Sequence, residues 1–171
     1  GLAMHASRDL VNWDVIGHAL PAEHFPDWFA LPRHGGGVWA PSIRHHDGLF
    51  HVVYPDPDHG ILVVSAENPA GPWSAPRTLL AGLGLIDPCP LWDDDGQTYL
   101  VHGWAASRAG RKNIVTVVPV DAGLTTALGP GVDVIDGDAL DGYRTLEGPK
   151  FYKRDGWYWI FAPAGGVADG W

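Results

Sequence analysis

The sequence has 171 residues, of which 46% are hydrophobic, and this is enough for one ordinary domain with a sizeable core. Its 11 basic and 20 acidic residues give a net charge of −9. This balance argues against a nucleic-acid backbone or an anionic membrane surface as partner, since both reward clustered Lys and Arg. No stretch approaches about 20 consecutive apolar residues, so we expect no membrane span. The single cysteine, Cys89, rules out an internal disulfide.

The opening residues read as the middle of a longer polypeptide. The chain begins with Gly1 rather than Met and ends at Trp171, just after a glycine-rich turn. The segment SRDLVNWDVIGHAL is typical of the outer strands of a sheet whose inner strands lie upstream of Gly1. We therefore expect residues 1–171 to be part of a single domain that is truncated at both ends.

Short strands dominate the rest of the chain, and the pattern predicts an all-β fold. Apolar runs rich in Val, Ile, Tyr and Trp are bounded by Gly, Pro, Asp and Asn, and no segment sustains a helical period. The clearest runs predict strands at Leu49–Tyr54, Ile61–Ala66, Thr98–His102, Ile114–Val120 and Trp157–Ala162.

Three Asp-Gly pairs lie between these runs, at Asp47-Gly48, Asp95-Gly96 and Asp155-Gly156, and each predicts a hairpin turn. They also mark an internal repeat. The segments WAPSIRHHDGLFHVVY, DPCPLWDDDGQTYLVHG and EGPKFYKRDGWYWIFAP share one pattern, in which an apolar stretch leads to Asp-Gly and then to a second strand. The repeat starts are 48 and 60 residues apart, a spacing that predicts propeller blades of four strands.

The residues eight positions before the three turn aspartates are Trp39, Asp87 and Glu147. The innermost strand of a blade lines the central channel, so we expect these equivalent positions to converge on one pocket. The blades are expected at about residues 39–80, 86–135 and 146–171, the last being half a blade.

Because strands alternate in direction, the second strand of each blade ends on the face where the first strand begins. The connections at residues 55–60, 103–113 and 163–169 should therefore rim the pocket. Asp56 and Asp58 follow a second strand rather than opening an inner one, so we assign them to this rim, where they could contact the substrate.

Glu147 opens the third inner strand in the context Leu-Glu-Gly-Pro-Lys. Burial among Trp and Tyr would raise its pKa, as a general acid requires near neutral pH. The alternative is a solvated loop glutamate that pairs with Lys150.

Asp87 and Trp39 each allow two interpretations. Asp87, in Ile-Asp-Pro-Cys-Pro, is either a turn aspartate before proline or a second carboxylate that keeps Glu147 protonated by repulsion and orients the acid or the sugar. Trp39, in Val-Trp-Ala-Pro-Ser, is either a core residue or a stacking face for a sugar ring.

We expect no protein-bound metal in this segment. The nine histidines show no metal-ligand spacing, and the adjacent His45 and His46 would point to opposite faces of a strand. The acidic run at residues 93–95 is not a calcium loop, because Leu91 stands where the calcium pattern should begin.

Taken in order, SRDLVNW, GGVWAPSI, GLIDPCPLWDDDGQTYLVHGWA and TLEGPKFYKRDGWYWIFAPAGG resemble glycoside hydrolase family 43, which holds β-xylosidases, α-L-arabinofuranosidases and arabinanases. The resemblance covers nearly the whole chain. It implies a five-bladed β-propeller, of which this chain would supply roughly half, as part of one glycoside hydrolase catalytic domain.

The resemblance also implies an inverting single displacement with three acidic residues. Glu147 matches the general acid of the Glu-Gly-Pro motif, and Asp87 matches the aspartate that tunes the pKa of the acid and orients it. The general base is an aspartate of the first blade, which this sequence does not contain. Asp56 and Asp58 resemble the Asp-Pro-Asp motif of that base but lie in another blade. We therefore expect the segment alone to be inactive.

The implied substrates are pentosides of xylan or arabinoxylan, with a preference for β-xylosidase activity because the WAPS and DPCP contexts resemble that branch. Trp39, Ile86 and Trp104 are expected to contact the sugar. No cofactor is required in this segment, although a structural calcium in the complete propeller would fit. The expected partner is an oligosaccharide or polysaccharide, with no nucleic acid and no membrane.

Two other functions remain open at this stage. One is a retaining furanosidase on the same scaffold, which would need two carboxyl groups about 5–5.5 Å apart rather than about 6.5–9.5 Å. The other is a non-catalytic propeller that only binds sugar.

Overall fold

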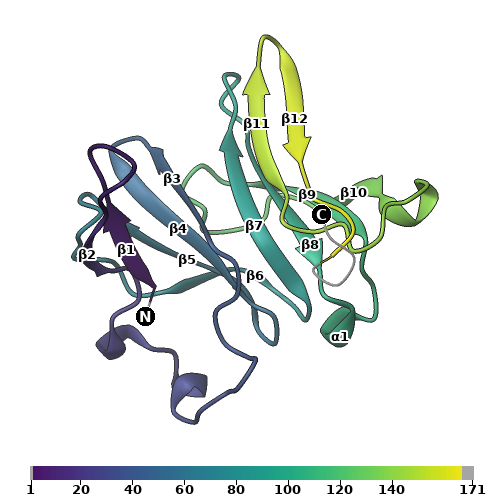
Figure 1. Ribbon diagram of the computed structural model, residues 1–171. Coiled ribbons are helices and arrows are strands. Elements are labelled where there is room, and N and C mark those ends of the chain that lie inside the picture. Colours follow the sequence, from purple (N-terminus) through teal and green to yellow (C-terminus); the bar gives the residue numbers. More distant parts are fainter. Residues whose placement is uncertain (1, 167–171) are drawn as a thin grey trace.

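The computed structural model describes residues 2–166. These residues form four antiparallel sheets that follow one another along the chain, two with four strands and two with two strands (Figure 1). A two-stranded hairpin lies at each end of the series, and the two complete sheets lie between them. Every pair of bonded strands is consecutive in sequence, which is the up-and-down order of a propeller blade.

The first hairpin pairs β1 (Ala3–Ala6) with β2 (Asp14–His18). The connection between them is held by Asp9, whose carboxylate accepts the backbone N–H groups of Val11 and Asn12 at 2.9 and 2.8 Å. Much of the SRDLVNW segment is therefore a turn, where the sequence pattern predicted strand. A side chain that accepts nearby backbone N–H groups competes with strand pairing, which explains the difference.

The remaining strands form one sheet after another. The first complete sheet comprises β3 (Ser42–His46), β4 (Leu49–Asp56), β5 (Gly60–Ala66) and β6 (Arg77–Ala81). The second comprises β7 (Leu85–Trp92), β8 (Thr98–Trp104), β9 (Ile114–Val120) and β10 (Val132–Asp136). The last hairpin pairs β11 (Lys150–Arg154) with β12 (Trp157–Phe161). All five strands named from the sequence are present, with ends that differ by at most two residues.

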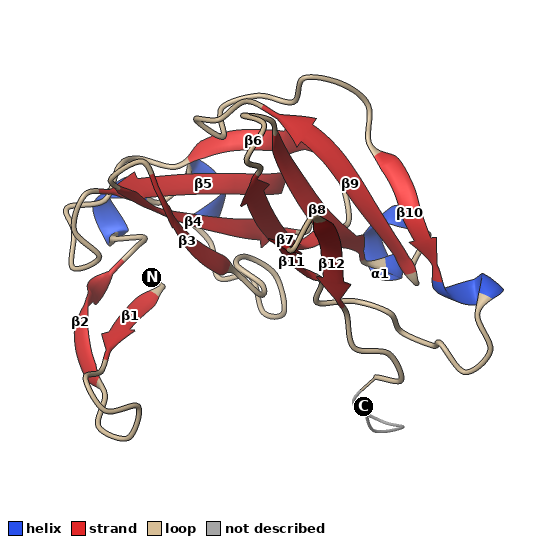
Figure 2. Cartoon of the chain, turned by 90° about the horizontal axis from the view of Figure 1, so that it is seen from above, coloured by secondary structure: helices blue, strands red, loops and turns tan. Residues whose placement is uncertain are grey.

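Helical turns in the described residues lie only in connections between strands (Figure 2). Two short 3₁₀ turns, Ala22–His24 and Asp27–Phe29, precede the first complete sheet, and a third, Gly137–Ala139, follows β10. The short helix α1 (Ala106–Ala109) joins β8 to β9. No helix of the described chain is long and apolar enough to cross a membrane.

The Asp-Gly pairs form the predicted turns. Asp47 and Gly48 have φ values of 47° and 77°, and Asp155 and Gly156 have φ values of 53° and 78°. Positive φ at both central residues is the hairpin geometry that matches the twist of paired strands. The pair at residues 95–96 differs, since of the two only Gly96, with φ 84°, has positive φ.

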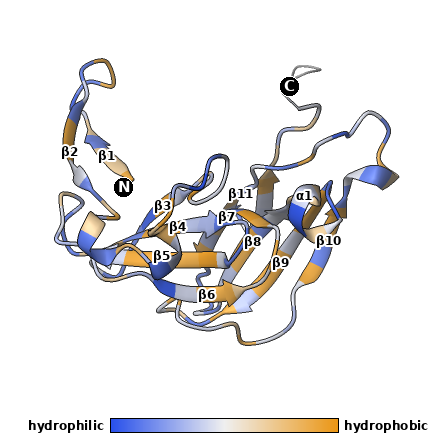
Figure 3. Cartoon of the chain, turned by 90° about the horizontal axis from the view of Figure 1, so that it is seen from below, coloured by the Kyte–Doolittle hydropathy of each residue, from blue (hydrophilic) through white to orange (hydrophobic). Residues whose placement is uncertain are grey.

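The apolar core consists of three clusters, one between each pair of neighbouring sheets. Strand β5 shows how this arises, because Ile61 and Val63 face the second complete sheet while Leu62 and Val64 face the first hairpin. Such alternation buries both faces of one strand. Hydrophobic residues accordingly gather along the strands of the complete sheets (Figure 3). The all-β propeller prediction is thus confirmed, with blades at nearly the expected boundaries.

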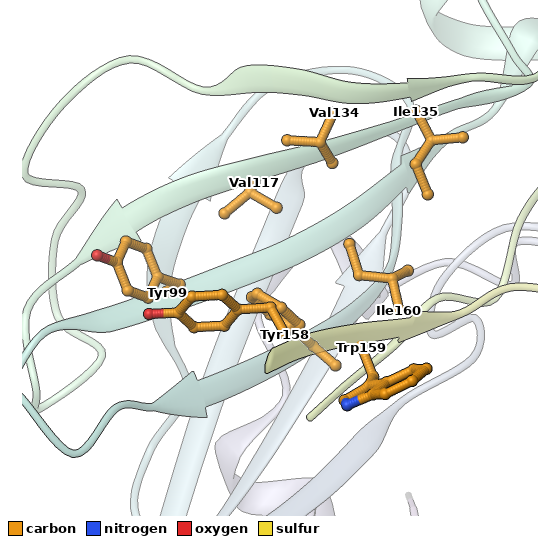
Figure 4. A pocket seen from close by; sticks show the side chains of 8 residues that line it. Tyr99, Val117, Val134, Ile135, Tyr158, Trp159 and Ile160 are labelled. Carbon is orange, nitrogen blue, oxygen red and sulfur yellow. The ribbon is translucent and has the colours of Figure 1, made fainter. Parts of the chain in front are cut away.

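An open apolar pocket of about 610 Å³ lies beside the last hairpin (Figure 4). Tyr99 and Tyr158 lie at one end of it, and Ile160 and Val117 contribute to its wall. Several large side chains of β12 are exposed, including Trp157 at 72%. Within residues 2–166 no further strand pairs with β12, and the pocket flanks this hairpin.

Candidate active site

Strand β7 is interrupted by a β-bulge at Asp87. Its register with β8 shifts between Ile86 and Cys89, and Asp87 has φ 55°, a left-handed conformation that non-glycine residues seldom adopt. Bulges re-aim side chains, and backbone strain of this kind persists where the surroundings hold it in place. The carboxylate of Asp87 accordingly reaches the neighbouring blade, where its Oδ2 accepts the backbone N–H of Gly148 at 2.8 Å.

The bulge is also held from the other side. The buried hydroxyl of Ser42, in the first residue of β3, donates to the carbonyl oxygen of Pro88 at 2.6 Å. Trp39 lies three residues before Ser42, and its backbone N–H donates to the carbonyl of Pro55 at 3.1 Å. Ser42 and Gly148, from the blades on either side, therefore both bind the bulge at residues 87–88, whereas the contacts of Trp39 are with Gly35, Pro55 and Arg108.

Glu147 lies in a short connection that is fixed at two points. The N–H of Leu146 donates to Oδ1 of the buried Asn113 at 3.0 Å, and the N–H of Glu147 itself donates to the carbonyl of Pro163 at 3.3 Å. The flanking Thr145 has φ 57°, another left-handed conformation. The half-buried Glu147 side chain is thus presented by a constrained backbone next to the residue that binds Asp87.

The pKa of both carboxyl groups is raised, and the charge of Asp87 contributes to the shift of Glu147. Burial and then the negative charge of Asp87 raise the pKa of Glu147. Burial also raises the pKa of Asp87, but the N–H of Gly148 and the positive charge of Lys150 act in the opposite direction. Within residues 2–166 no ion pair reaches Glu147, so Lys150 acts on Asp87 rather than pairing with Glu147.

Ile86 and Gly103 form a close apolar wall beside the glutamate. They are opposite each other in the β7–β8 ladder, and Ile86 is buried. A methyl group at Gly103 would lie 3.6 Å from Cγ1 of Ile86 and 3.9 Å from Cα of Glu147. The face of β8 that carries Gly103 is therefore turned toward Glu147.

Trp104 lies on the other face of β8, because consecutive side chains of a strand point to opposite sides. Its indole N–H donates to Oγ1 of Thr116 at 2.8 Å, and the guanidinium of Arg111 lies 4.4 Å from its ring centre. The ring packs against the core between the two complete sheets. The structure does not bring Trp104 together with Glu147, and its contact with sugar stays a prediction that these contacts do not support.

Two of the connections predicted to form the rim, at residues 55–60 and 103–113, contact each other. The half-buried indole of Trp39 donates its N–H to the carbonyl of Gly35 at 3.2 Å, and Arg108, on α1, lies 5.2 Å from its ring centre. Asp56 is fully buried and Asp58 pairs with Arg108 at 3.0 Å, so neither is a free carboxylate. Of the third predicted connection, residues 167–169 lie outside the described residues.

Sequence reasoning missed the groups that hold the two carboxylates. Ser42 could have been suspected from its fixed place in the WAPS repeat segment, but Asn113 and the N–H of Gly148 have no signal of their own in one sequence. No group of three or more His, Cys, Asp or Glu side chains is positioned to hold a metal ion in the part of the chain that the structure describes.

The chain is similar to known proteins over nearly its whole length. Residues 1–170 match the family profile of glycosyl hydrolases family 43. The chain is 39% identical over 171 residues to a putative beta-xylosidase of Xylanibacter ruminicola, covering 100% of this chain and 31% of that protein. It is 32% identical to a non-reducing end alpha-L-arabinofuranosidase of Bacteroides ovatus, covering 98% of this chain and 30% of that protein.

Solved structures show the same likeness. A xylan beta-1,4-xylosidase from Bacillus halodurans matches with a TM-score of 0.79 and 30% identity, over 95% of this chain and 32% of that one. A family 43 protein from a capybara gut metagenome matches with a TM-score of 0.80 and 28% identity, over 98% of this chain and 34% of that one. The chain therefore spans about a third of the length of these relatives. It belongs to glycoside hydrolase family 43.

Proposed function

We propose that this chain supplies the proton-donating part of an inverting glycoside hydrolase that cleaves pentosides of xylan or arabinoxylan. The observation that carries the proposal is the junction of β7 and the segment before β11. There a strained, buried Asp87 binds the N–H of Gly148 and its charge acts on the half-buried Glu147. Carboxyl groups whose pKa is raised by burial and by a neighbouring carboxylate are typical of acid–base sites.

Glu147 is the proton donor in this scheme. The charged form of Asp87 is stabilised by a backbone N–H and by Lys150, whereas every influence on Glu147 raises its pKa. We therefore assign the proton to Glu147, which delivers it to the departing glycosidic oxygen. Asp87 stays ionised, keeps Glu147 protonated in the resting enzyme and fixes the backbone beside it.

The water-activating base comes from outside this chain in our proposal. The obvious candidates within it, Asp56 and Asp58, are committed to Arg33 and Arg108. The relatives are about three times as long, which leaves room for a base in another blade. In an inverting enzyme that base would lie about 6.5–9.5 Å from Glu147, across the bound sugar, so that a water molecule fits between.

The substrate class follows from the relatives and from the walls of the site. Proteins named as xylosidases and arabinofuranosidases are similar to this chain over nearly its whole length, and all of these names refer to pentose sugars. Ile86 would close the pocket beside the glutamate, and Trp39 would stack on a sugar ring. The β-xylosidase preference rests on the motif context alone.

The proposal is tested by Glu147→Gln in a polypeptide that carries this segment within a complete propeller. General acid catalysis is worth about 10²–10⁴ in rate, so kcat on an unactivated xylobioside should fall by that factor. The kcat on a dinitrophenyl xyloside, whose leaving group needs no proton, should fall far less. Glu67→Gln, at an exposed glutamate after β5, is the matched control and should change neither rate.

Two results would contradict this account. Unchanged hydrolysis in Glu147→Gln would show that Glu147 is not the general acid. A complete lack of hydrolysis in the parent protein, with sugar binding retained, would favour a propeller that only binds sugar. NMR of the first-formed product decides between inversion and retention, since the retaining rival would release the sugar with its original anomeric configuration.

A further inference from the structure

A line of alternating charges runs along the rim from the buried Asp56 to the indole of Trp39. The side chain of Asp56 is fully buried, and Arg33 binds both of its oxygens, at 2.6 and 3.1 Å. Trp28 donates its indole N–H to the same carboxylate at 3.0 Å. Asp56 is thus a fully bonded anchor for Arg33.

The line continues outward through Asp58. Arg33 also binds Oδ2 of Asp58 at 2.6 Å, and Oδ1 of Asp58 accepts Nε of Arg108 at 3.0 Å. The bond from Arg108, followed by that from Arg33, lowers the pKa of Asp58, so this carboxylate stays charged. Two arginines and two aspartates balance each other here, so Arg108 is not a free cation awaiting an anionic ligand.

The backbone of helix α1, which carries Arg108, is also fixed by close contacts. Gly84, in the turn before β7, donates its N–H to the carbonyl of Pro57 at 2.7 Å and accepts the N–H of Ala105 at 2.8 Å. Its φ is 75°, and a methyl group there would lie only 2.6 Å from Cβ of Ala109, so only glycine lets α1 approach this closely. Helix α1 and the β4–β5 turn are therefore packed together, and Arg108 has a fixed base.

Arg108 covers one face of Trp39. Its guanidinium lies 5.2 Å from the ring centre, within the range of a cation–π contact. The indole N–H is bound to the carbonyl of Gly35, so the ring is held by two contacts, and the bond from the backbone N–H to the carbonyl of Pro55 fixes the backbone of Trp39. One face of Trp39 is then occupied, and a sugar can stack only on the other.

We propose that Arg108, held by Asp58 and Arg33, is the positioning residue that fixes the indole of Trp39 and confines the sugar to the face opposite the guanidinium. This inference rests on the proposed role of Trp39 as a sugar platform. Stacking on Trp39 acts on bound substrate and transition state alike, so losing its alignment raises KM and leaves kcat in place.

The chain provides its own control. Trp104 has the same kind of partner, because Arg111 lies 4.4 Å from its ring centre and pairs with Asp133 at 2.6 Å. That ring packs against the core between the complete sheets rather than at the Asp87–Glu147 junction. Removing Arg111 therefore disturbs an equivalent contact without touching the proposed platform.

The experiment measures kcat and KM for xylobiose in a complete propeller that carries this segment. Arg108→Gln and Asp58→Asn should each raise KM roughly three- to tenfold, the scale of a cation–π contact, with kcat and the pH profile unchanged. Arg108→Lys, which keeps the charge above the ring, should recover part of the loss. Arg111→Gln should leave KM unchanged, and thermal unfolding followed by circular dichroism establishes that each variant is folded.

A double-mutant cycle separates positioning from direct contact. In a Trp39→Ala background, Arg108→Gln should add nothing to KM. A further rise in that background would mean that Arg108 binds substrate itself, and an unchanged KM in Arg108→Gln alone would overturn the inference while leaving Trp39 as the platform.

If Trp39→Ala leaves KM unchanged, the platform role itself fails. The positioning is then judged in the 171-residue chain by the fluorescence of Trp39, taken as the difference from Trp39→Phe. Arg108→Gln should shift that emission, and an identical difference spectrum would overturn the positioning as well.

Discussion

At one end of the interface between β7 and β11 lie Asp87 and Glu147, and at the other end lie Asp93, Lys153 and Tyr158. Asp93 follows β7 directly, and its carboxylate accepts bonds from the ammonium of Lys153 and the hydroxyl of Tyr158. The bond from Lys153, followed by that from Tyr158, lowers the pKa of Asp93. At the opposite end the pKa of both carboxyl groups is raised.

The two ends of this interface therefore have different roles: the Asp93 end stabilises the fold, and the Asp87–Glu147 end serves the proposed function. Asp93 has its charge satisfied by the neighbouring blade, so its ionised form supports the fold. Glu147 has no such partner in the described chain, and burial together with Asp87 opposes its ionisation. A carboxyl group that is costly to ionise is a poor structural element but a suitable proton donor. The predictions below test whether the two ends divide in this way.

The largest effect is expected for Glu147→Gln. Activity should fall about 10²–10⁴-fold, as for loss of a general acid, yet Tm should stay the same or rise because a buried and repelled carboxyl group is removed. Thermal unfolding at pH 7 measures this beside the kinetics. A clear loss of Tm would mean that Glu147 supports the fold and that the division between the two ends is wrong.

Asp87→Asn should have the next largest effect. Asparagine tolerates the left-handed backbone at φ 55° and can still accept the N–H of Gly148, so the fold should be kept. Losing the charge lowers the pKa of Glu147, so the alkaline limb of the kcat/KM profile should move to lower pH, and kcat should fall about tenfold or more. An unshifted alkaline limb would contradict the coupling.

Asp93→Asn should reverse this pattern, with a lower Tm and unchanged kcat. The amide cannot replace the charge that pairs with Lys153. Asp94→Asn is the matched control, since that carboxylate is 92% exposed and lies 3.6 Å from the same ammonium, and its Tm should barely change. Equal Tm values for the two variants would show that the pairing of Asp93 with Lys153 adds no stability.

The smallest effect concerns acid pH. His51 and His102 are buried, and burial is the main cause that lowers the pKa of each. The unfolded chain then takes up the protons first, near the ordinary histidine pKa of about 6.5, so stability is complete above that pH and falls as the pH drops below it. Tm measured from pH 8 to pH 5 should decline, and less steeply in His102→Gln. A flat profile would contradict the prediction.

Much of the fold could be predicted because its signals are local. Asp-Gly turns and alternating apolar runs depend on a few neighbouring residues, so the five strands named from the sequence lie within two residues of their observed ends. The repeat also placed Trp39, Asp87 and Glu147 at equivalent strand starts. That arrangement needs only a common blade geometry.

The remainder depends on contacts between distant segments. The left-handed bulge at Asp87 is stabilised by Ser42 and Gly148, and no local sequence pattern predicts these contacts. Trp104 is predicted to contact the sugar, and no local pattern indicates that its ring lies on the face of β8 opposite to that of Gly103. One missed contact did leave a trace: Asp93 and Lys153 both lie six residues after their repeat starts, with opposite charges.

The most direct test of the account is the titration of the Glu147 carboxyl carbon by ¹³C NMR in this chain, with and without Asp87→Asn. We predict a pKa above the ordinary glutamate value in the unmodified chain and a lower value in the variant. A pKa at or below the ordinary value, or one that Asp87→Asn leaves unchanged, would show that the two carboxyl groups do not form a coupled acid site.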